Sequence, residues 1–139
     1  MTLDTLSNIA RDILKKARDV KFETATILTL QGDLGAGKTT LTQEISKQLG
    51  IKDKVISPTF VIMKKYEVLD KKFKNLIHID SYRFEKSDEI FKLGWKEMTN
   101  NKDNLIILEW PENVIEFIPE NVLKIKISHI DESNRELEF

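Results

Sequence analysis

The chain has 139 residues, a net charge of −1 at neutral pH and no cysteine. This length is the size of one domain, and we expect residues 1–139 to form a single unit. The near-zero charge argues against binding nucleic acid, DNA included, by general electrostatics, and the lack of cysteine excludes disulfides and thiolate metal sites. Because no stretch approaches the ~20 apolar residues of a membrane span, and the N-terminus lacks a signal-peptide pattern, we expect a cytoplasmic protein with no membrane partner.

The first third of the chain predicts helix, strand, loop and helix. Residues 2–19 carry apolar side chains at helical spacing and predict an amphipathic helix that packs on a sheet. Residues 24–30 form an apolar, β-branched run that is typical of a buried strand. Residues 39–49 again have helical spacing and are closed by Gly50.

The loop between that strand and the second helix fits a phosphate-binding pattern. Residues 32–39 read Gly-Asp-Leu-Gly-Ala-Gly-Lys-Thr, which is glycine, four residues, then Gly-Lys-Ser/Thr. Glycines let backbone N–H groups converge on phosphate oxygens, and the start of a helix adds unpaired N–H groups and a positive dipole end. We expect Lys38 to reach the β- and γ-phosphates and the Thr39 hydroxyl to bind Mg²⁺. The residues predicted to contact the nucleotide here are Asp33, Leu34, Gly35, Ala36, Gly37, Lys38, Thr39 and Thr40.

A plain glycine-rich turn is the alternative for this loop, but the flanking strand and helix favour phosphate binding.

The middle of the chain then predicts a hairpin. Residues 55–63 read as strand, turn, strand, because Pro58 cannot donate to a strand ladder and fits a bend or an edge. We interpret the charged tip at residues 70–74 as solvated, with docking of an acidic partner or RNA as the alternative. Residues 75–80 predict a buried strand.

The last third alternates helices and strands. Ser87 is expected to cap a helix over residues 88–93 that stops at Gly94, with further helical turns to residue 100. The remaining expected elements are a buried strand at 105–110, a short helix at 111–117, an alternating strand at 122–127 and an edge strand at 135–139. Strands that alternate with helices around a phosphate loop predict a three-layer α/β, P-loop NTPase-like fold, and the hairpin predicts that its central sheet is mixed.

A phosphate loop needs an acidic partner for its metal at the end of a neighbouring strand. Glu109 and Asp80 each end a short apolar run, which places them at the edge where α/β sheets bind ligands; a surface acid is the alternative for each. We predict that Lys38, Asp80 and Glu109 are catalytic: Glu109 holds Mg²⁺ directly or through water, and Asp80 orients water. Trp110 could lie over the nucleotide or in the core, and His78 reads as packed or hydrogen-bonded in the sheet rather than catalytic.

Five short motifs follow one another along the chain, and together they are specific. They are Gly-Asp-Leu-Gly-Ala-Gly-Lys-Thr-Thr at 32–40, Ser-Pro-Thr-Phe at 57–60, His-Ile-Asp-Ser-Tyr-Arg at 78–83, Leu-Gly at 93–94 and Glu-Trp-Pro-Glu at 109–112. In this order the set resembles the TsaE (YjeE) family, the bacterial ATPase of the tRNA threonylcarbamoyladenosine pathway, over essentially the whole chain.

The resemblance implies a small ATPase that binds ATP and Mg²⁺ and hydrolyses ATP slowly. It implies that the chain acts on TsaB and TsaD, which transfer a threonylcarbamoyl group to N6 of adenosine 37 in tRNA, and resets that complex between turnovers. Contact with tRNA would be indirect, through the complex. The resemblance also implies that residues 57–60, with Thr59, sense the γ-phosphate and that Arg135 approaches the nucleotide. Residues 95–98 depart from the family's more usual acidic-aromatic stretch, which would affect docking rather than chemistry.

Two other functions fit the same loop. In a small-molecule kinase, Asp80 and Arg83 would hold the acceptor, but the sequence has no arginine-rich lid segment, which phosphoryl transfer usually needs. In a nucleotide-dependent binding module, ATP would order residues 57–60 into a docking surface with little hydrolysis. The sequence also lacks the Asn-Lys-x-Asp segment that reads guanine, which favours ATP over GTP.

Overall fold

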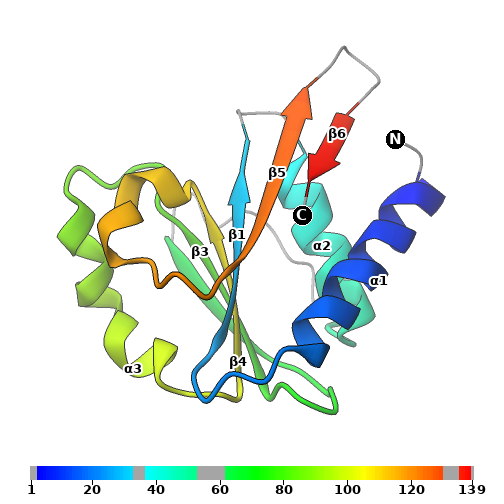
Figure 1. Ribbon diagram of the computed structural model, residues 1–139, viewed down its shortest axis with the longest axis horizontal. Coiled ribbons are helices and arrows are strands. Elements are labelled where there is room, and N and C mark those ends of the chain that lie inside the picture. The colour runs from blue at the N-terminus through cyan, green and yellow to red at the C-terminus, as the bar shows by residue number, and fades with distance from the viewer. Residues whose placement is uncertain (1–2, 33–36, 53–61, 130–134, 139) are drawn as a thin grey trace.

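A computed structural model describes residues 3–32, 37–52, 62–129 and 135–138. Six strands form one sheet in the order β2-β3-β4-β1-β5-β6 (Figure 1). Strands β3, β4, β1 and β5 run parallel, whereas β2 and β6 pair antiparallel at the two edges, so the predicted mixed sheet is confirmed. The strands are β1 (Thr26–Gln31), β2 (Met63–Glu67), β3 (Asn75–Asp80), β4 (Asn104–Glu109), β5 (Leu123–His129) and β6 (Arg135–Glu138).

Helices cover both faces of the sheet, which confirms the three layers. Helices α1 (Leu3–Asp19) and α2 (Lys38–Gln48) lie on one face, and the 3₁₀ helices η1 (Ser87–Leu93) and η2 (Pro111–Phe117) with α3 (Trp95–Thr99) lie on the other (Figure 1). Each face has its own apolar cluster, because successive residues of a strand point to opposite faces. None of the helices that the structure describes is long and apolar enough to cross a membrane.

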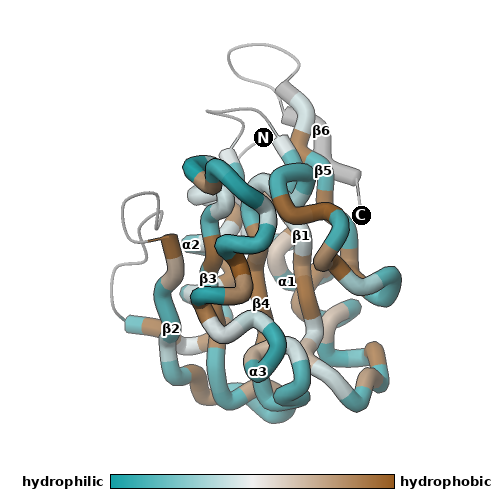
Figure 2. Tube along the Cα trace, turned by 90° about the vertical axis from the view of Figure 1, so that its left-hand side faces the viewer, coloured by the Kyte–Doolittle hydropathy of each residue, from teal (hydrophilic) through white to brown (hydrophobic). Residues whose placement is uncertain are grey.

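The central strands are nearly continuous apolar runs, as expected for strands covered on both faces. Figure 2 shows hydrophobic residues concentrated along β1, β3 and β4, while the outer loops are largely hydrophilic. These three strands end at Gln31, Asp80 and Glu109. Because the strands are parallel, the three residues lie at the same edge of the sheet, which we call the carboxyl edge.

Two of the predicted helices are 3₁₀ helices, and one predicted cap is wrong. Ser87 is the first residue of η1 rather than its cap, because the backbone departs from helical geometry at Lys86. Instead, the Glu89 carboxylate accepts hydrogen bonds from the N–H groups of Lys86 (3.1 Å) and Glu85 (2.7 Å), and these lower the pKa of the Glu89 carboxyl. The predicted stop at Gly94 is confirmed, since its φ of 84° is the left-handed conformation that favours glycine.

The charged hairpin tip between β2 and β3 is not simply solvated, contrary to our interpretation of the sequence. The Asp70 carboxylate accepts hydrogen bonds from Nε (3.0 Å) and Nη2 (2.7 Å) of Arg18, near the end of α1. The Lys72 ammonium donates to carbonyls at the end of the same helix, including that of Ala17 at 2.9 Å. The tip therefore satisfies carbonyl groups that the last turn of a helix leaves open, and it joins α1 to the hairpin.

We expect the Asp70→Ala variant to lose about 1–3 kcal/mol of unfolding free energy, because the substitution strips Arg18 and two backbone N–H groups of their acceptor. Burial raises the pKa of the Asp70 carboxyl, but the hydrogen bonds from Arg18 and from the backbone outweigh it, and the net pKa is lowered. This contribution is therefore present above the carboxyl's ordinary pKa and is lost as the pH falls through its lowered value.

Urea unfolding of the wild type and of Asp70→Ala at pH 7 and at pH 3 tests this expectation. The difference in unfolding free energy between the two proteins should be smaller at pH 3 than at pH 7. The matched control is Asp103→Ala, which removes a pair at 3.7 Å between the half-buried Asp103 and the exposed Lys74, and it should change stability by less than about 1 kcal/mol. Equal stability of the two variants at pH 7 would contradict a role for the tip in holding α1.

Candidate functional site

The carboxyl edge brings together the two predicted acids. In the sheet register Asp80 of β3 pairs with Glu109 of β4, and Glu109 also pairs with Leu30 of β1. Glu109 therefore lies between the end of β3 and the start of the phosphate loop. The two acids are 5% and 2% exposed, respectively, so neither is a plain surface acid at a strand end. Buried carboxylates at a ligand-binding edge are candidates for chemistry.

Lys38 lies at the start of α2 and is only 6% exposed. Its ammonium donates a hydrogen bond to the Gly32 carbonyl and lies 3.7 Å from the centroid of the Trp110 ring. The first turn of α2 contains no acidic residue, and no side chain among the described residues caps it. The helix N-terminus therefore combines a positive dipole end with a buried lysine, which is an arrangement that suits a phosphate.

Trp110 follows Glu109 directly and is held in an uncommon backbone conformation, with φ 60° and ψ 52°. Its N–H donates to the Leu30 carbonyl (3.3 Å), and its carbonyl accepts from the Ser81 hydroxyl (2.6 Å). Its ring lies 4.9 Å from that of Tyr82. A strained backbone conformation of this kind persists only where surrounding contacts stabilise it. Here those contacts hold the indole ring of Trp110 over the Lys38 ammonium.

We expect Ser81→Ala to loosen Trp110, because the Ser81 hydroxyl also donates to the Glu109 carbonyl (2.9 Å) and is buried. The loss should be about 1–2 kcal/mol of unfolding free energy and should make Trp110 easier for acrylamide to quench. Ser87→Ala is the control, since Ser87 lies outside this network. Unchanged quenching in Ser81→Ala would show that the strained conformation of Trp110 does not depend on this hydroxyl.

Asp80, the last residue of β3, is held by hydrogen bonds to the backbone of two other residues. Its Oδ1 accepts from the N–H of Tyr82 at 2.9 Å, and its own N–H donates to the carbonyl of Ile62 at 2.8 Å. Ile62 immediately precedes β2 and has a φ of 70°, which is uncommon for a β-branched residue. The carboxylate is therefore held at the carboxyl edge, beside Glu109.

The sequence interpretation missed one partner of Glu109. Nε2 of His78 is hydrogen-bonded to Oε2 of Glu109, and the His78 ring is fully buried. His78 is thus hydrogen-bonded in the sheet, as expected, but its acceptor is a predicted catalytic carboxylate. The available signal was alternation: His78 and Asp80 lie two residues apart and face the same side of β3.

The described residues fit a magnesium nucleotide better than a metal bound by protein alone. No group of three or more acids, histidines or cysteines among them could hold an ion. Mg²⁺ in phosphate-loop sites needs no such group, because it is bound by one or two protein ligands together with phosphates and water. Glu109 at the carboxyl edge and Thr39 in the first turn of α2 carry oxygen atoms of the kind that such sites use.

The sequence matches a family model over almost its full length. The model is described as "Threonylcarbamoyl adenosine biosynthesis protein TsaE", and it matches residues 2–137. The chain belongs to the TsaE family. A relative in Bacillus subtilis, a tRNA threonylcarbamoyladenosine biosynthesis protein TsaE, is 41% identical over 115 residues, which are 81% of this chain and 68% of the relative.

Two further comparisons support membership of the TsaE family. The protein of the same description in Rickettsia prowazekii is 37% identical over 110 residues, which are 78% of this chain and 73% of that protein. The crystal structure of YdiB from Bacillus subtilis superposes with a TM-score of 0.68 at 29% identity, covering 99% of this chain and 78% of that one. The three-layer α/β fold is therefore shared with a solved structure.

The structure places some of the other predicted site residues and does not describe the rest. Gly37 precedes α2 with a φ of 102°, Thr39 is partly exposed and Thr40 is exposed on the first turn. Arg135 is the first residue of β6, which pairs with β5 at the edge of the sheet and is separated from β1 by β5. Asp33, Leu34, Gly35, Ala36 and Thr59 lie outside the described residues.

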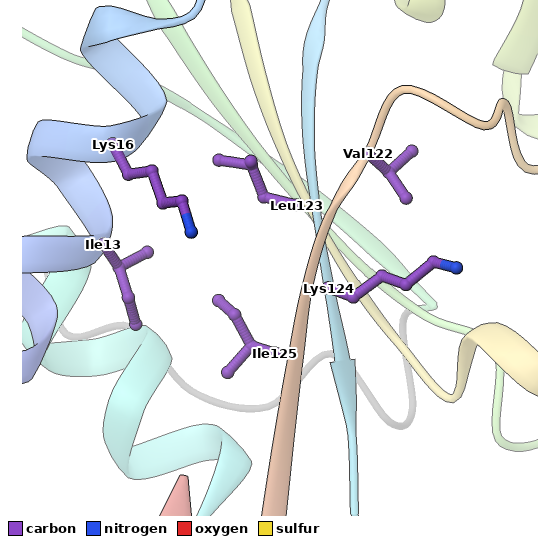
Figure 3. A pocket seen from close by; sticks show the side chains of 6 residues that line it. All are labelled: Ile13, Lys16, Val122, Leu123, Lys124 and Ile125. Atoms are coloured by element: carbon purple, nitrogen blue, oxygen red, sulfur yellow. The ribbon is translucent and has the colours of Figure 1, made fainter. Parts of the chain in front are cut away.

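A separate hollow lies between α1 and β5, with a volume of about 260 Å³. Figure 3 shows Ile13 and Lys16 of α1 facing Leu123 and Ile125 across it. None of these residues belongs to the predicted nucleotide site.

Proposed function

We propose that the chain binds ATP with Mg²⁺ at the carboxyl edge, hydrolyses it slowly, and uses this turnover in the threonylcarbamoyladenosine modification of tRNA. The observation that carries the proposal is the Lys38 ammonium, which is buried at the start of α2 and lies over the ring of Trp110, the residue that follows Glu109. A buried cation at a helix N-terminus favours a polyphosphate, and the two carboxylates at the carboxyl edge are what a metal and an attacking water require.

Each residue then has a role that follows from its place. Lys38 and the first N–H groups of α2 bind the β- and γ-phosphates and stabilise charge on them during transfer to water. Thr39 and Glu109 hold Mg²⁺, which neutralises phosphate charge. Asp80 orients the attacking water, since its carboxylate is fixed at the same edge. Trp110 shields the Lys38 ammonium from solvent, which strengthens its attraction for phosphate.

We further propose that residues 1–139 act as one ATPase unit in the cytoplasm and that their target is the TsaB–TsaD complex. Support comes from membership of the TsaE family and from the ordered motifs of the sequence. Thr59 and Arg135 remain proposed nucleotide contacts on the resemblance alone. In this scheme tRNA is bound by the complex, and the chain allows the complex to complete many rounds of modification.

Reconstitution tests the proposal. Purified chain, TsaB, TsaD and unmodified tRNA are mixed with ATP and a supply of the threonylcarbamoyl donor, and modified tRNA is counted per TsaD. We expect slow ATP hydrolysis by the chain alone, faster hydrolysis with TsaB and TsaD, and several modified tRNAs per TsaD only when the chain is present. Equal tRNA modification without the chain would contradict the proposed role. Hydrolysis raised by a metabolite and not by the two proteins would favour a kinase.

A further inference from the structure

His78 is a buried polar side chain close to the carboxyl edge, and the proposed chemistry gives it no task. Its Nδ1 has no hydrogen-bond partner among the residues that the structure describes, while Nε2 is bonded to Glu109. Leaving one ring nitrogen unpaired in a buried site costs free energy, and an apolar side chain of similar volume would fill the same space without that cost. The interaction that accounts for a histidine here is the one between Nε2 and the carboxylate.

We propose that His78 is a positioning residue for Glu109. An ionised carboxylate only accepts hydrogen bonds, so Nε2 of a neutral ring must carry the hydrogen. The imidazole thereby holds Oε2 and restricts the rotamers of the carboxylate, leaving Oε1 for the metal or its water. This inference rests on the function proposed above, because it assigns His78 to the carboxylate that is proposed to hold Mg²⁺.

The sheet register explains why these two residues can meet. His78 pairs with Ile107 in the parallel ladder, and Asp80 pairs with Glu109 two residues further on. Side chains two residues apart share a face, so all four lie on the same side of the sheet. Leu76, Leu105 and Ile107 on this side belong to the apolar cluster packed by α1 and α2, which places His78 directly behind the phosphate site.

Three substitutions separate positioning from space filling. His78→Leu removes both ring nitrogens, His78→Asn places an amide near the position of Nδ1, and His78→Gln places an N–H near the position of Nε2. We expect kcat for ATP to fall about 10- to 100-fold in the leucine and asparagine variants, as for other partners that orient a metal ligand. The glutamine variant should recover most of this loss. Nucleotide affinity measured in EDTA should stay within a few-fold of wild type in all three, whereas the Mg²⁺ concentration needed for half-maximal turnover should rise in leucine and asparagine.

The imidazole can also be observed directly, without any turnover. The chain contains two histidines, so ¹⁵N-labelled rings give a simple NMR spectrum, and His129→Gln assigns the signals. We expect His78 in the Nε2–H tautomer, with both ring nitrogen signals shifting in Glu109→Ala. An Nδ1–H tautomer, or ring nitrogen signals that are unchanged in Glu109→Ala, would overturn the inference. This test holds even if a variant at His78 fails to fold.

Equal kcat and equal Mg²⁺ requirement in folded His78→Leu would also overturn it. If instead the wild-type chain neither hydrolysed ATP nor required Mg²⁺, the proposed function would fail. The NMR result would still decide whether His78 holds the Glu109 carboxylate.

Discussion

Replacing Lys38 by alanine is expected to lower ATP turnover about 10²- to 10³-fold, because it removes a positive charge from a buried site where charge acts strongly. The same variant should lose multiple-turnover tRNA modification in the reconstituted system. Nucleotide affinity should fall as well, since the ammonium interacts with phosphate in both the bound state and the transition state. Initial rates of phosphate release at saturating ATP, together with equilibrium binding of a fluorescent ATP analogue, measure the two effects separately.

Lys47→Ala is the matched control for this substitution. Lys47 lies in the last turn of the same helix and is exposed, so its loss changes net charge equally without touching the site. We expect wild-type turnover in the control and similar thermal stability in both variants. Full tRNA modification by folded Lys38→Ala would show that phosphate binding at this lysine is not needed for the function.

Glu109→Gln is expected to lower kcat about 10²-fold or more while leaving binding of the nucleotide in EDTA nearly unchanged. The amide keeps the volume of the side chain but removes the negative charge that would hold Mg²⁺. The substitution should also raise the Mg²⁺ concentration that half-maximal turnover requires. Turnover measured across a Mg²⁺ series at saturating ATP checks both expectations.

Glu112→Gln, three residues along the chain and exposed on η2, is the control and should behave as wild type. The two variants also distinguish two hypotheses for the function, an ATPase and a nucleotide-dependent binding module. Loss of hydrolysis and of tRNA modification in Glu109→Gln would show that turnover matters. Retention of tRNA modification without hydrolysis would favour a nucleotide-dependent binding module and would contradict the ATPase role proposed here.

Local patterns predicted the parts of the site that depend on short stretches of chain. The strands ending at Asp80 and Glu109 were predictable because each is a short apolar run closed by an acid, and parallel strands bring such ends to one edge. The start of α2 was predictable because glycines before a helical pattern mark a phosphate loop. Both predictions could be made without knowing which residues pair with each other across the sheet.

Contacts between distant residues could not be predicted in the same way. The His78–Glu109 bond joins residues 31 apart, and it depends on the register of β3 against β4, which packing of the whole sheet sets. The Arg18–Asp70 bond joins residues 52 apart, so the hairpin tip read as solvated when its own sequence was considered alone. The strained backbone of Trp110 likewise arises from contacts with Leu30 and Ser81, which lie far away in sequence.

Titration calorimetry with a non-hydrolysable ATP analogue tests the central claim most directly. We expect one nucleotide per chain to bind, more tightly with Mg²⁺ than in EDTA, more tightly than the GTP analogue, and much more weakly to Lys38→Ala. Absence of binding by the folded wild-type chain at millimolar nucleotide, or binding that Lys38→Ala leaves intact, would contradict a phosphate site at the start of α2.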